Sequence, residues 1–163
     1  MDTSTRRAAG GALAGAGAAT LWAAQQPLDK RLFRGAYDDI ELLGKLATRG
    51  PAWPAAGLLM HAGNGAAFGT VYALVRPHLP GPPLVQAVAA AMAENFGFWP
   101  LGRLIDHFHP ARSELEPLRG NRRALAQATW RHLLFGIALG VLEARVNGRI
   151  PSSESPATTG RHA

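Results

Sequence analysis

The sequence predicts an all-α protein, a four-span transmembrane helix bundle made of two parallel helical-hairpin repeats with interfacial helices in the long connections. The first observation behind this prediction is the distribution of charge. Charged residues concentrate outside four blocks, approximately 8–26, 54–75, 84–101 and 124–146. Each block has about the length needed to cross a hydrocarbon core of roughly 30 Å at about 1.5 Å per residue. The second observation is an internal repeat.

The repeat is a duplicated helix, HAGNGAAFGTVYALV from His61 and HLLFGIALGVLEARV from His132. The two strings share an HxxxGxxxG pattern, in which Gly65 and Gly69 correspond to Gly136 and Gly140. On a helix the histidine and both glycines fall on one face, where another helix can press its backbone. The pattern predicts close packing over repeats 8–75 and 84–146, and it fits packing within the bundle and homodimerisation equally well.

Composition limits the function classes. The chain has 163 residues, a formal net charge of +6 and no cysteine. The length fits one membrane domain over 1–150, followed by a tail at 151–163 with a disordered composition. The lack of cysteine excludes disulfides, thiol catalysis and thiolate metal sites. The positive charge lies in the connections, which favours membrane flanks over a nucleic-acid surface; a water-soluble bundle of Ala-rich helices is the alternative.

The first block, 8–26, follows Arg6 and Arg7 and could be interpreted as an export signal. However, its exit sequence at Pro27-Leu28 recurs at Pro100-Leu101, after the third block. We therefore assign it to the fold and expect the first helix to leave the membrane at Pro27.

The long connections predict interfacial helices. In the first connection, Asp38 and Asp39 suit a helix start, and the residues that follow place an apolar face along one side: Ile40, Leu43 and Ala47. Leu104, Ile105 and Phe108 form a similar stretch in the second connection. Between the second and third blocks, RPHLPGPP predicts a stiff, tight turn.

The distribution of cations predicts the orientation. The long connections hold ten Lys and Arg residues, against six on the opposite side. The positive-inside rule then places the long connections in the cytoplasm of a multi-pass inner (plasma) membrane protein, although Arg6 and Arg7 favour the opposite orientation.

Polar residues inside the blocks form the candidate site: Glu94, His61, His132, Arg131, Asn64 and Asn95. His61 and His132 lie seven and eight residues after the start of their blocks, and Glu94 lies seven before the end of its block, so all three are expected at about 10 to 12 Å below the same membrane face. We expect Glu94 to pair with Arg131 or a histidine, or to be protonated. The layer either binds protons or a substrate, or it ties the helices together.

Other chemistry finds less support. Two symmetric histidines could ligate haem, or a metal together with Glu94, but no CxxCH or HExxH motif accompanies them. The Asp106-His107-Phe108-His109 fragment resembles a metal motif, yet its alternation suits an interface. Phosphate-binding glycine loops and a GxSxG elbow are lacking. We therefore predict no catalytic residue, no metal and no cofactor.

The string GALAGAGAATLW, followed by HxxxGxxFGxxYAL and HxxFGxxLGxxxA helices, resembles small uncharacterised bacterial inner-membrane proteins of the YagU-like kind. This resemblance covers most of 8–146 and implies a four-helix membrane protein without assigning catalytic residues. The first expectation is a non-enzymatic structural, interaction or envelope component in the lipid bilayer, and a homodimer is one possible form. The alternatives are a small transporter or proton-coupled carrier and, third, a metal- or haem-binding membrane protein.

Overall fold

The computed structural model describes residues 2–148, which form helices joined by loops and contain no strand. Six α-helices and two short 3₁₀ segments follow one another along these residues: α1 (Thr3–Phe33), α2 (Asp39–Ala47), α3 (Trp53–Val75), η1 (Arg76–His78), α4 (Pro83–Phe98), η2 (Trp99–Leu101), α5 (Gly102–Phe108) and α6 (Arg122–Asn147). The all-α prediction is confirmed for this part of the chain. The tail predicted at 151–163 lies outside the described residues.

Short polar side chains and prolines begin the helices. The side chain of Asp2 accepts a hydrogen bond from the Thr5 amide at 2.7 Å, and α2 and α6 begin in the same way at Asp38 and Asn121. Prolines occupy the first turns of α3 and α4, where a missing N–H costs nothing.

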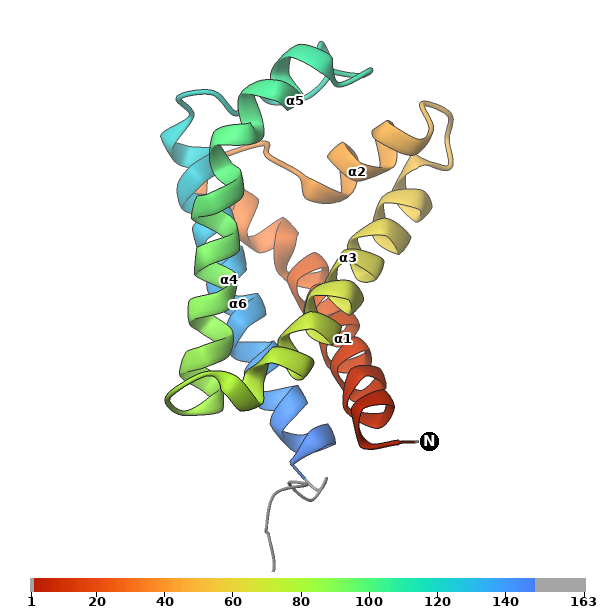
Figure 1. Cartoon of the computed structure of the whole chain (residues 1–163). Coiled ribbons are helices and arrows are strands. Elements are labelled where there is room, and N and C mark those ends of the chain that lie inside the picture. Colours follow the sequence, from red (N-terminus) through yellow and green to blue (C-terminus); the bar gives the residue numbers. More distant parts are fainter. Residues whose placement is uncertain (1, 149–163) are drawn as a thin grey trace, which may run out of the picture.

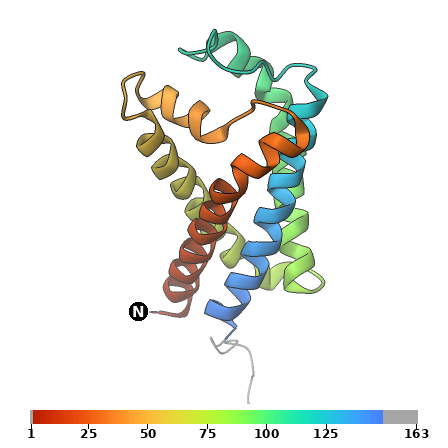
Figure 2. The ribbon, with the colours of Figure 1, turned by 180° about the vertical axis from the view of Figure 1, so that it is seen from behind.

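The four long helices run between the two ends of the molecule, and α1 and α3 cross each other on the way (Figures 1 and 2). The two long connections, with α2 and α5, lie at one end. The N-terminus, the end of α6 and the proline turn between α3 and α4 lie at the other. Helix α1 packs on α3 and α6, and α4 packs on α6. From the proline turn, α3 and α4 diverge toward the end that carries α2 and α5 (Figure 1).

Glycines bring α1 and α3 into backbone contact. A Cβ atom added to Gly15 would lie 1.9 Å from the carbonyl oxygen of Gly65, and one added to Gly69 would lie 2.1 Å from that of Gly11. No side chain fits at such distances. The glycine face of α3 is therefore occupied by α1, within the chain.

Gly136 and Gly140 of α6 pack on α4, as Gly65 and Gly69 of α3 pack on α1. Added Cβ atoms on Gly136 and Gly140 would lie 2.8 Å from the Cα of Val88 and 3.0 Å from the Cα of Leu84. Each HxxxGxxxG helix thus packs its glycines on the long Ala-rich helix that precedes it. These four glycines serve contacts inside the bundle.

The first helix is longer than the sequence predicts. It continues through Pro27 to Phe33, although proline removes one backbone hydrogen bond and crowds the preceding turn. The residues after Pro27 explain the continuation, because Asp29 is fully buried and pairs with Arg131 of α6. This tertiary contact outweighs the local preference of proline to end the helix.

The connections contain the expected short helices. Helix α2 covers the predicted amphipathic stretch and packs on α3, where a Cβ on Gly44 would lie 2.0 Å from the carbonyl oxygen of Trp53. Helix α5 covers Leu104, Ile105 and Phe108.

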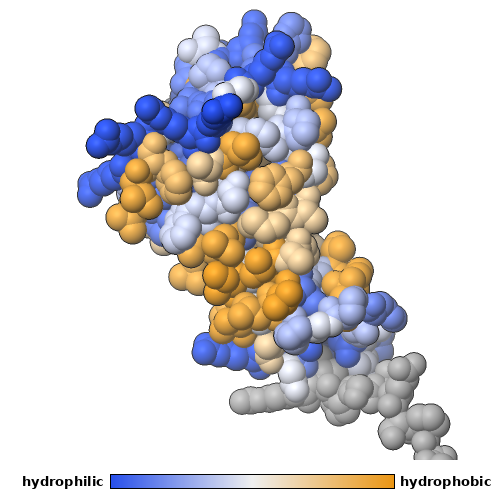
Figure 3. All heavy atoms as spheres, turned by 90° about the vertical axis from the view of Figure 1, so that its left-hand side faces the viewer, coloured by the Kyte–Doolittle hydropathy of each residue, from blue (hydrophilic) through white to orange (hydrophobic). Residues whose placement is uncertain are grey.

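Two segments of the described chain, Trp53–His78 and Arg122–Asn147, are long and apolar enough to cross a membrane. They contain α3 and α6. Helix α4 has 16 residues, or about 24 Å, which is shorter than a typical span. Figure 3 shows apolar side chains in the middle of the face that carries α4 and α6, between a large hydrophilic end and a smaller one. Four apolar side chains of α4 and α6 are 41 to 60% exposed: Leu84, Val85, Phe96 and Ile137.

The glycine contact between α1 and α3 predicts the effect of a single methyl group. Gly69→Ala should destabilise the fold by about 1 to 3 kcal/mol, because the methyl meets the backbone of Gly11. Gly63→Ala, on the same helix with open space around it, should be neutral or stabilising by up to about 1 kcal/mol. Unfolding by SDS in mixed micelles, followed by circular dichroism, measures both. Equal effects of the two substitutions would contradict the packing described.

Candidate functional site

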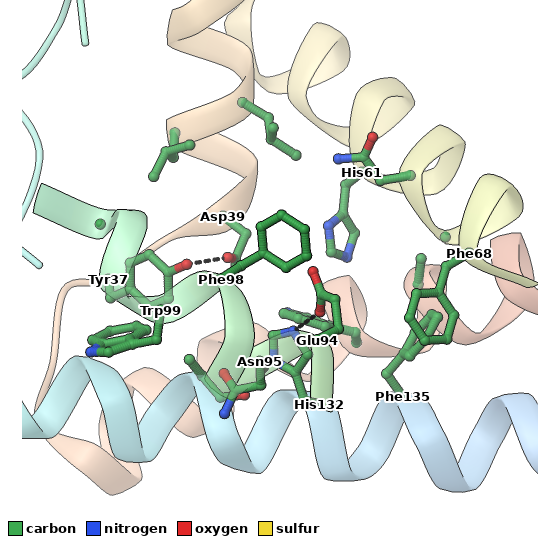
Figure 4. Close-up of a pocket in the computed structure, with 18 of the residues that line it drawn as sticks. Tyr37, Asp39, His61, Phe68, Glu94, Asn95, Phe98, Trp99, His132 and Phe135 are labelled. Carbon is green, nitrogen blue, oxygen red and sulfur yellow. Dashed lines mark hydrogen bonds and ion pairs between the residues drawn. The ribbon is translucent and has the colours of Figure 1, made fainter. Parts of the chain in front are cut away.

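Five of the six polar residues singled out in the sequence line one cavity of about 250 Å³: His61, Asn64, Glu94, Asn95 and His132. The cavity lies among the long helices at the end where α3 and α4 diverge, and residues of α2 and α5 also line it. The close-up in Figure 4 shows His61 and Glu94 facing each other across it. Arg131 is not among the lining residues.

Glu94 pairs with a histidine. Its Oε2 lies 2.6 Å from Nε2 of His132, and Nδ1 of His132 lies 2.8 Å from the carbonyl oxygen of Ala128. Because a carbonyl only accepts, Nδ1 carries a proton. A carboxylate oxygen and Nε2 at 2.6 Å then require a second proton between them, on Glu94 or on His132. The hydrogen bond between Glu94 and His132 therefore contains one proton, carried by either group, at the wall of the cavity.

Trp22 of α1 separates the two histidines. Its ring lies edge-on to both, with centroid distances of 4.9 Å to His61 and 4.7 Å to His132. His61 is only 7% exposed, and its Nε2 has no hydrogen-bond partner. A buried polar atom without a partner at a cavity wall is a group that a ligand or water can satisfy.

The two asparagines differ. Asn95 is buried and donates to the hydroxyl of Thr129 at 3.1 Å, which ties α4 to α6. Asn64 is exposed and borders the cavity. Asn95 therefore has a structural partner, whereas Asn64 has an open position at the rim.

Arg131 pairs with Asp29 and Asp39 rather than with Glu94. Its Nε and Nη2 donate to the two oxygens of Asp29, both at 2.7 Å, and its Nη1 donates to Asp39 at 2.5 Å. The amides of Gln25 and Gln127 each donate to Asp29 at 2.6 Å. Arg131 and Asp29 are both fully buried. This network joins α1, α2 and α6 directly behind the cavity.

Tyr37 completes the network. Its hydroxyl donates to Asp39 at 2.5 Å, its carbonyl accepts from Arg131 at 3.1 Å, and its ring lies 5.3 Å from the guanidinium carbon. Burial raises the pKa of Tyr37 well above 10.0, and the charge of Asp39 raises it further. Tyr37 therefore stays protonated and Asp39 stays an acceptor. Both residues line the cavity.

A second buried carboxylate lies near the opposite end of α6. Glu143 is 1% exposed, forms an ion pair with Arg76 after α3, and accepts from Asn147 at 3.1 Å. These contacts connect the proline turn to α6, and they account for Glu143 as a structural group.

The sequence reasoning did not single out four of the residues that shape this region: Asp29, Asp39, Tyr37 and Trp22. A buried arginine requires carboxylates, and Gln25 with Asp29 at i, i+4 was a usable signal. The assumption that the helix ends at Pro27 placed Asp29 outside the bundle. Trp22 gave no signal beyond its position in an Ala-rich helix.

The metal-like fragment has other contacts. The carboxylate of Asp106 accepts from the amides of Leu118 and Arg119 at 2.8 and 2.7 Å, and Nε2 of His109 lies 3.0 Å from the carbonyl oxygen of Leu42. These bonds stabilise the connection after α5. No group of three potential metal-ligating His, Asp or Glu side chains occurs in residues 2–148.

Comparison of the chain with protein-family models, curated proteins and solved structures found no match. The resemblance to YagU-like proteins therefore stays a prediction, and the functional argument rests on the cavity and its residues.

The buried ion network predicts a large stability effect. Arg131→Met leaves Asp29 buried without its cation and should cost about 3 to 5 kcal/mol. The double variant Arg131→Met/Asp29→Asn should recover part of the lost stability, because it no longer buries an unpaired carboxylate. Arg123→Met, at an exposed position of the same helix, should change stability by less than about 0.5 kcal/mol. SDS titrations of the four proteins test this, and a double variant no more stable than the single one would contradict it.

The raised pKa of Tyr37 predicts a loss of stability in alkali. Above pH 10.0 the unfolded chain releases the tyrosine proton while the folded chain retains it, so stability falls as pH rises toward the folded pKa. Tyr37→Phe should be less stable at neutral pH but should show a shallower decline between about pH 9.5 and 11. The second tyrosine of the chain is common to both proteins and cancels in the comparison. Identical slopes would exclude Tyr37 as a buried, protonated donor.

Proposed function

We propose that this protein is a small multi-pass membrane protein that binds a small ligand in the cavity in exchange for the proton of the Glu94–His132 pair, as a proton-coupled carrier does. One observation carries the proposal: the carboxylate and imidazole line a cavity instead of being packed between helices. A purely structural polar layer has no need of open space beside it.

The membrane assignment is supported by what the helices leave exposed. Within the apolar windows of the two span-like segments, only 28% and 39% of residues are buried. The core helix of a water-soluble protein would be mostly buried. Since α1 and α4 run beside α3 and α6 in the two hairpins, we propose that they cross the membrane too, with both repeats in the same sense. We place the long connections in the cytoplasm.

An interaction or envelope component without a ligand is less well supported. The small-residue motifs that could have formed a contact with another protein pack inside the bundle, at Gly65 and Gly69 on α1 and at Gly136 and Gly140 on α4. The polar layer, by contrast, remains accessible, since the Glu94 side chain is 39% exposed.

Proton exchange follows from the arrangement of the pair. If a ligand displaces the shared proton, the carboxylate of Glu94 becomes free to bind the ligand. If a proton returns to the pair, the ligand loses its contact with Glu94. The other titratable or charged groups near Glu94 are His61 from α3, Asp39 and Tyr37 at the start of α2, and Arg131 from α6, which acts through Asp39. Competition between the ligand and the proton for one site is the simplest way to couple the transport of the two.

Because the chain has no cysteine, a single introduced thiol can test whether water-soluble reagents reach the cavity. Asn64→Cys places a thiol at the cavity rim, and Gly63→Cys places one at the same depth where nothing lies within 4 Å. In membranes, a membrane-impermeant maleimide should label residue 64 and spare residue 63, which faces lipid. A carrier opens its site to both sides in turn, so residue 64 should be labelled in right-side-out and in inverted vesicles.

Each other result has a clear meaning. Equal labelling of residue 63 would place that face in water and reject the membrane assignment. Labelling of residue 64 from one side only would reject a carrier. No labelling of residue 64 from either side would mean that the cavity is closed.

A further inference from the structure

From the chemistry of the cavity wall we infer the ligand class: a small hydrophobic organic cation, bound between aromatic rings and the Glu94 carboxylate. This inference rests on the proposed function, since it names what the cavity takes up. The charge of the wall is its first support. Asp39 and Glu94 are the acidic side chains among the described residues that line the cavity, and none of these lining residues is lysine or arginine.

The network behind the wall does not cancel this charge. Asp29 and Asp39 share the single guanidinium of Arg131, so two negative charges meet one positive charge and one negative charge remains. Once the Glu94–His132 pair has lost its proton, Glu94 adds another. The field in the cavity is therefore negative and favours a cation over an anion.

Aromatic rings provide the second support. Six aromatic side chains border the cavity besides the two histidines: Trp22, Tyr37, Phe68, Phe98, Trp99 and Phe135. Figure 4 shows Phe98 between Asp39 and Glu94. The faces of aromatic rings attract cations, and the attraction is strongest where water is excluded. Phe98 is 62% exposed, so the apolar lining extends from the cavity to the surface of the molecule.

An unsatisfied atom provides the third, independent support. Nε2 of His61 is buried, lacks a partner and belongs to the wall opposite Glu94. It can accept a hydrogen bond from an ammonium N–H when Nδ1 carries the proton, or bind a water beside a quaternary cation. The cavity, about 250 Å³, lies just below the usual range of about 300 to 1,000 Å³ for ligand pockets, which limits the ligand to one ring and an ammonium head.

The test uses probes that differ in charge and little in shape. Benzyltrimethylammonium has a permanent charge; neopentylbenzene replaces its nitrogen by carbon, and phenylmethanesulfonate is an anion of similar size. Calorimetry on the purified full chain in detergent, with protein-free micelles as the blank, measures the affinity of each. The cation should bind at least about tenfold more tightly than either of the others. The affinity for the cation should rise with pH. Binding should also release protons, which appear as a dependence of the measured binding enthalpy on the ionisation enthalpy of the buffer.

Variants locate the site. Glu94→Gln keeps the side-chain shape and should weaken cation binding at least about tenfold and abolish the linked proton release. Glu114→Gln removes an acidic group that pairs with Lys45 and Arg49 outside the cavity, and should leave binding unchanged. Circular dichroism establishes that both variants are folded. The comparison of the three probes on the unaltered protein requires no variant at all.

The outcomes separate this inference from the proposed function. If neopentylbenzene or the anion binds as well as the cation, or if none of the probes binds, the cation assignment is wrong. The proposed carrier still stands in that case, provided that residue 64 is labelled from both sides of the membrane. If Glu94→Gln binds the cation unchanged, the site of recognition lies elsewhere and the inference fails.

Discussion

The bidentate ion pair between Arg131 and Asp29 is the interaction on which the arrangement depends. Both groups are fully buried, and either one alone would cost several kcal/mol in this environment. Their pairing requires α1 to continue past Pro27, brings that helix against α6, and leaves one guanidinium nitrogen for Asp39. Through Asp39 the same arginine positions the start of α2 at the cavity. A structural ion pair thereby sets the wall of the candidate site.

Glycine contacts determine where the helices approach and, by exclusion, where they do not. The backbones of α1 and α3 touch at Gly15 and Gly65, and Gly136 brings α6 against α4. The two hairpins meet mainly through α1 and α6, whereas α3 and α4 share only a proline turn and diverge from it. The cavity occupies the space that this divergence leaves. Tight packing on one side of the bundle is thus the reason for open space on the other.

The position of the Glu94–His132 pair connects the fold to chemistry. A hydrogen bond of 2.6 Å between a carboxyl group and an imidazole requires a shared proton, and both groups line the cavity. The ring of Trp22 lies edge-on to both His61 and His132, and Nε2 of His61 has no hydrogen-bond partner. His61 and His132 therefore differ in role, because His132 is hydrogen-bonded to Glu94 whereas Nε2 of His61 has no partner.

The sequence by itself determined the helical class, the bounds of α3 and α6 to within two residues, the short helix α2, and the grouping of His61, Glu94 and His132, which line one cavity. Periodicity, charge and distance along a helix are local properties, and they can be read without knowing any neighbour. Tertiary structure decided the rest: the partners of Arg131, the helix beyond Pro27, and the opening between α3 and α4. A buried polar residue shows that it needs a partner, but which side chain provides it depends on how the helices meet in space.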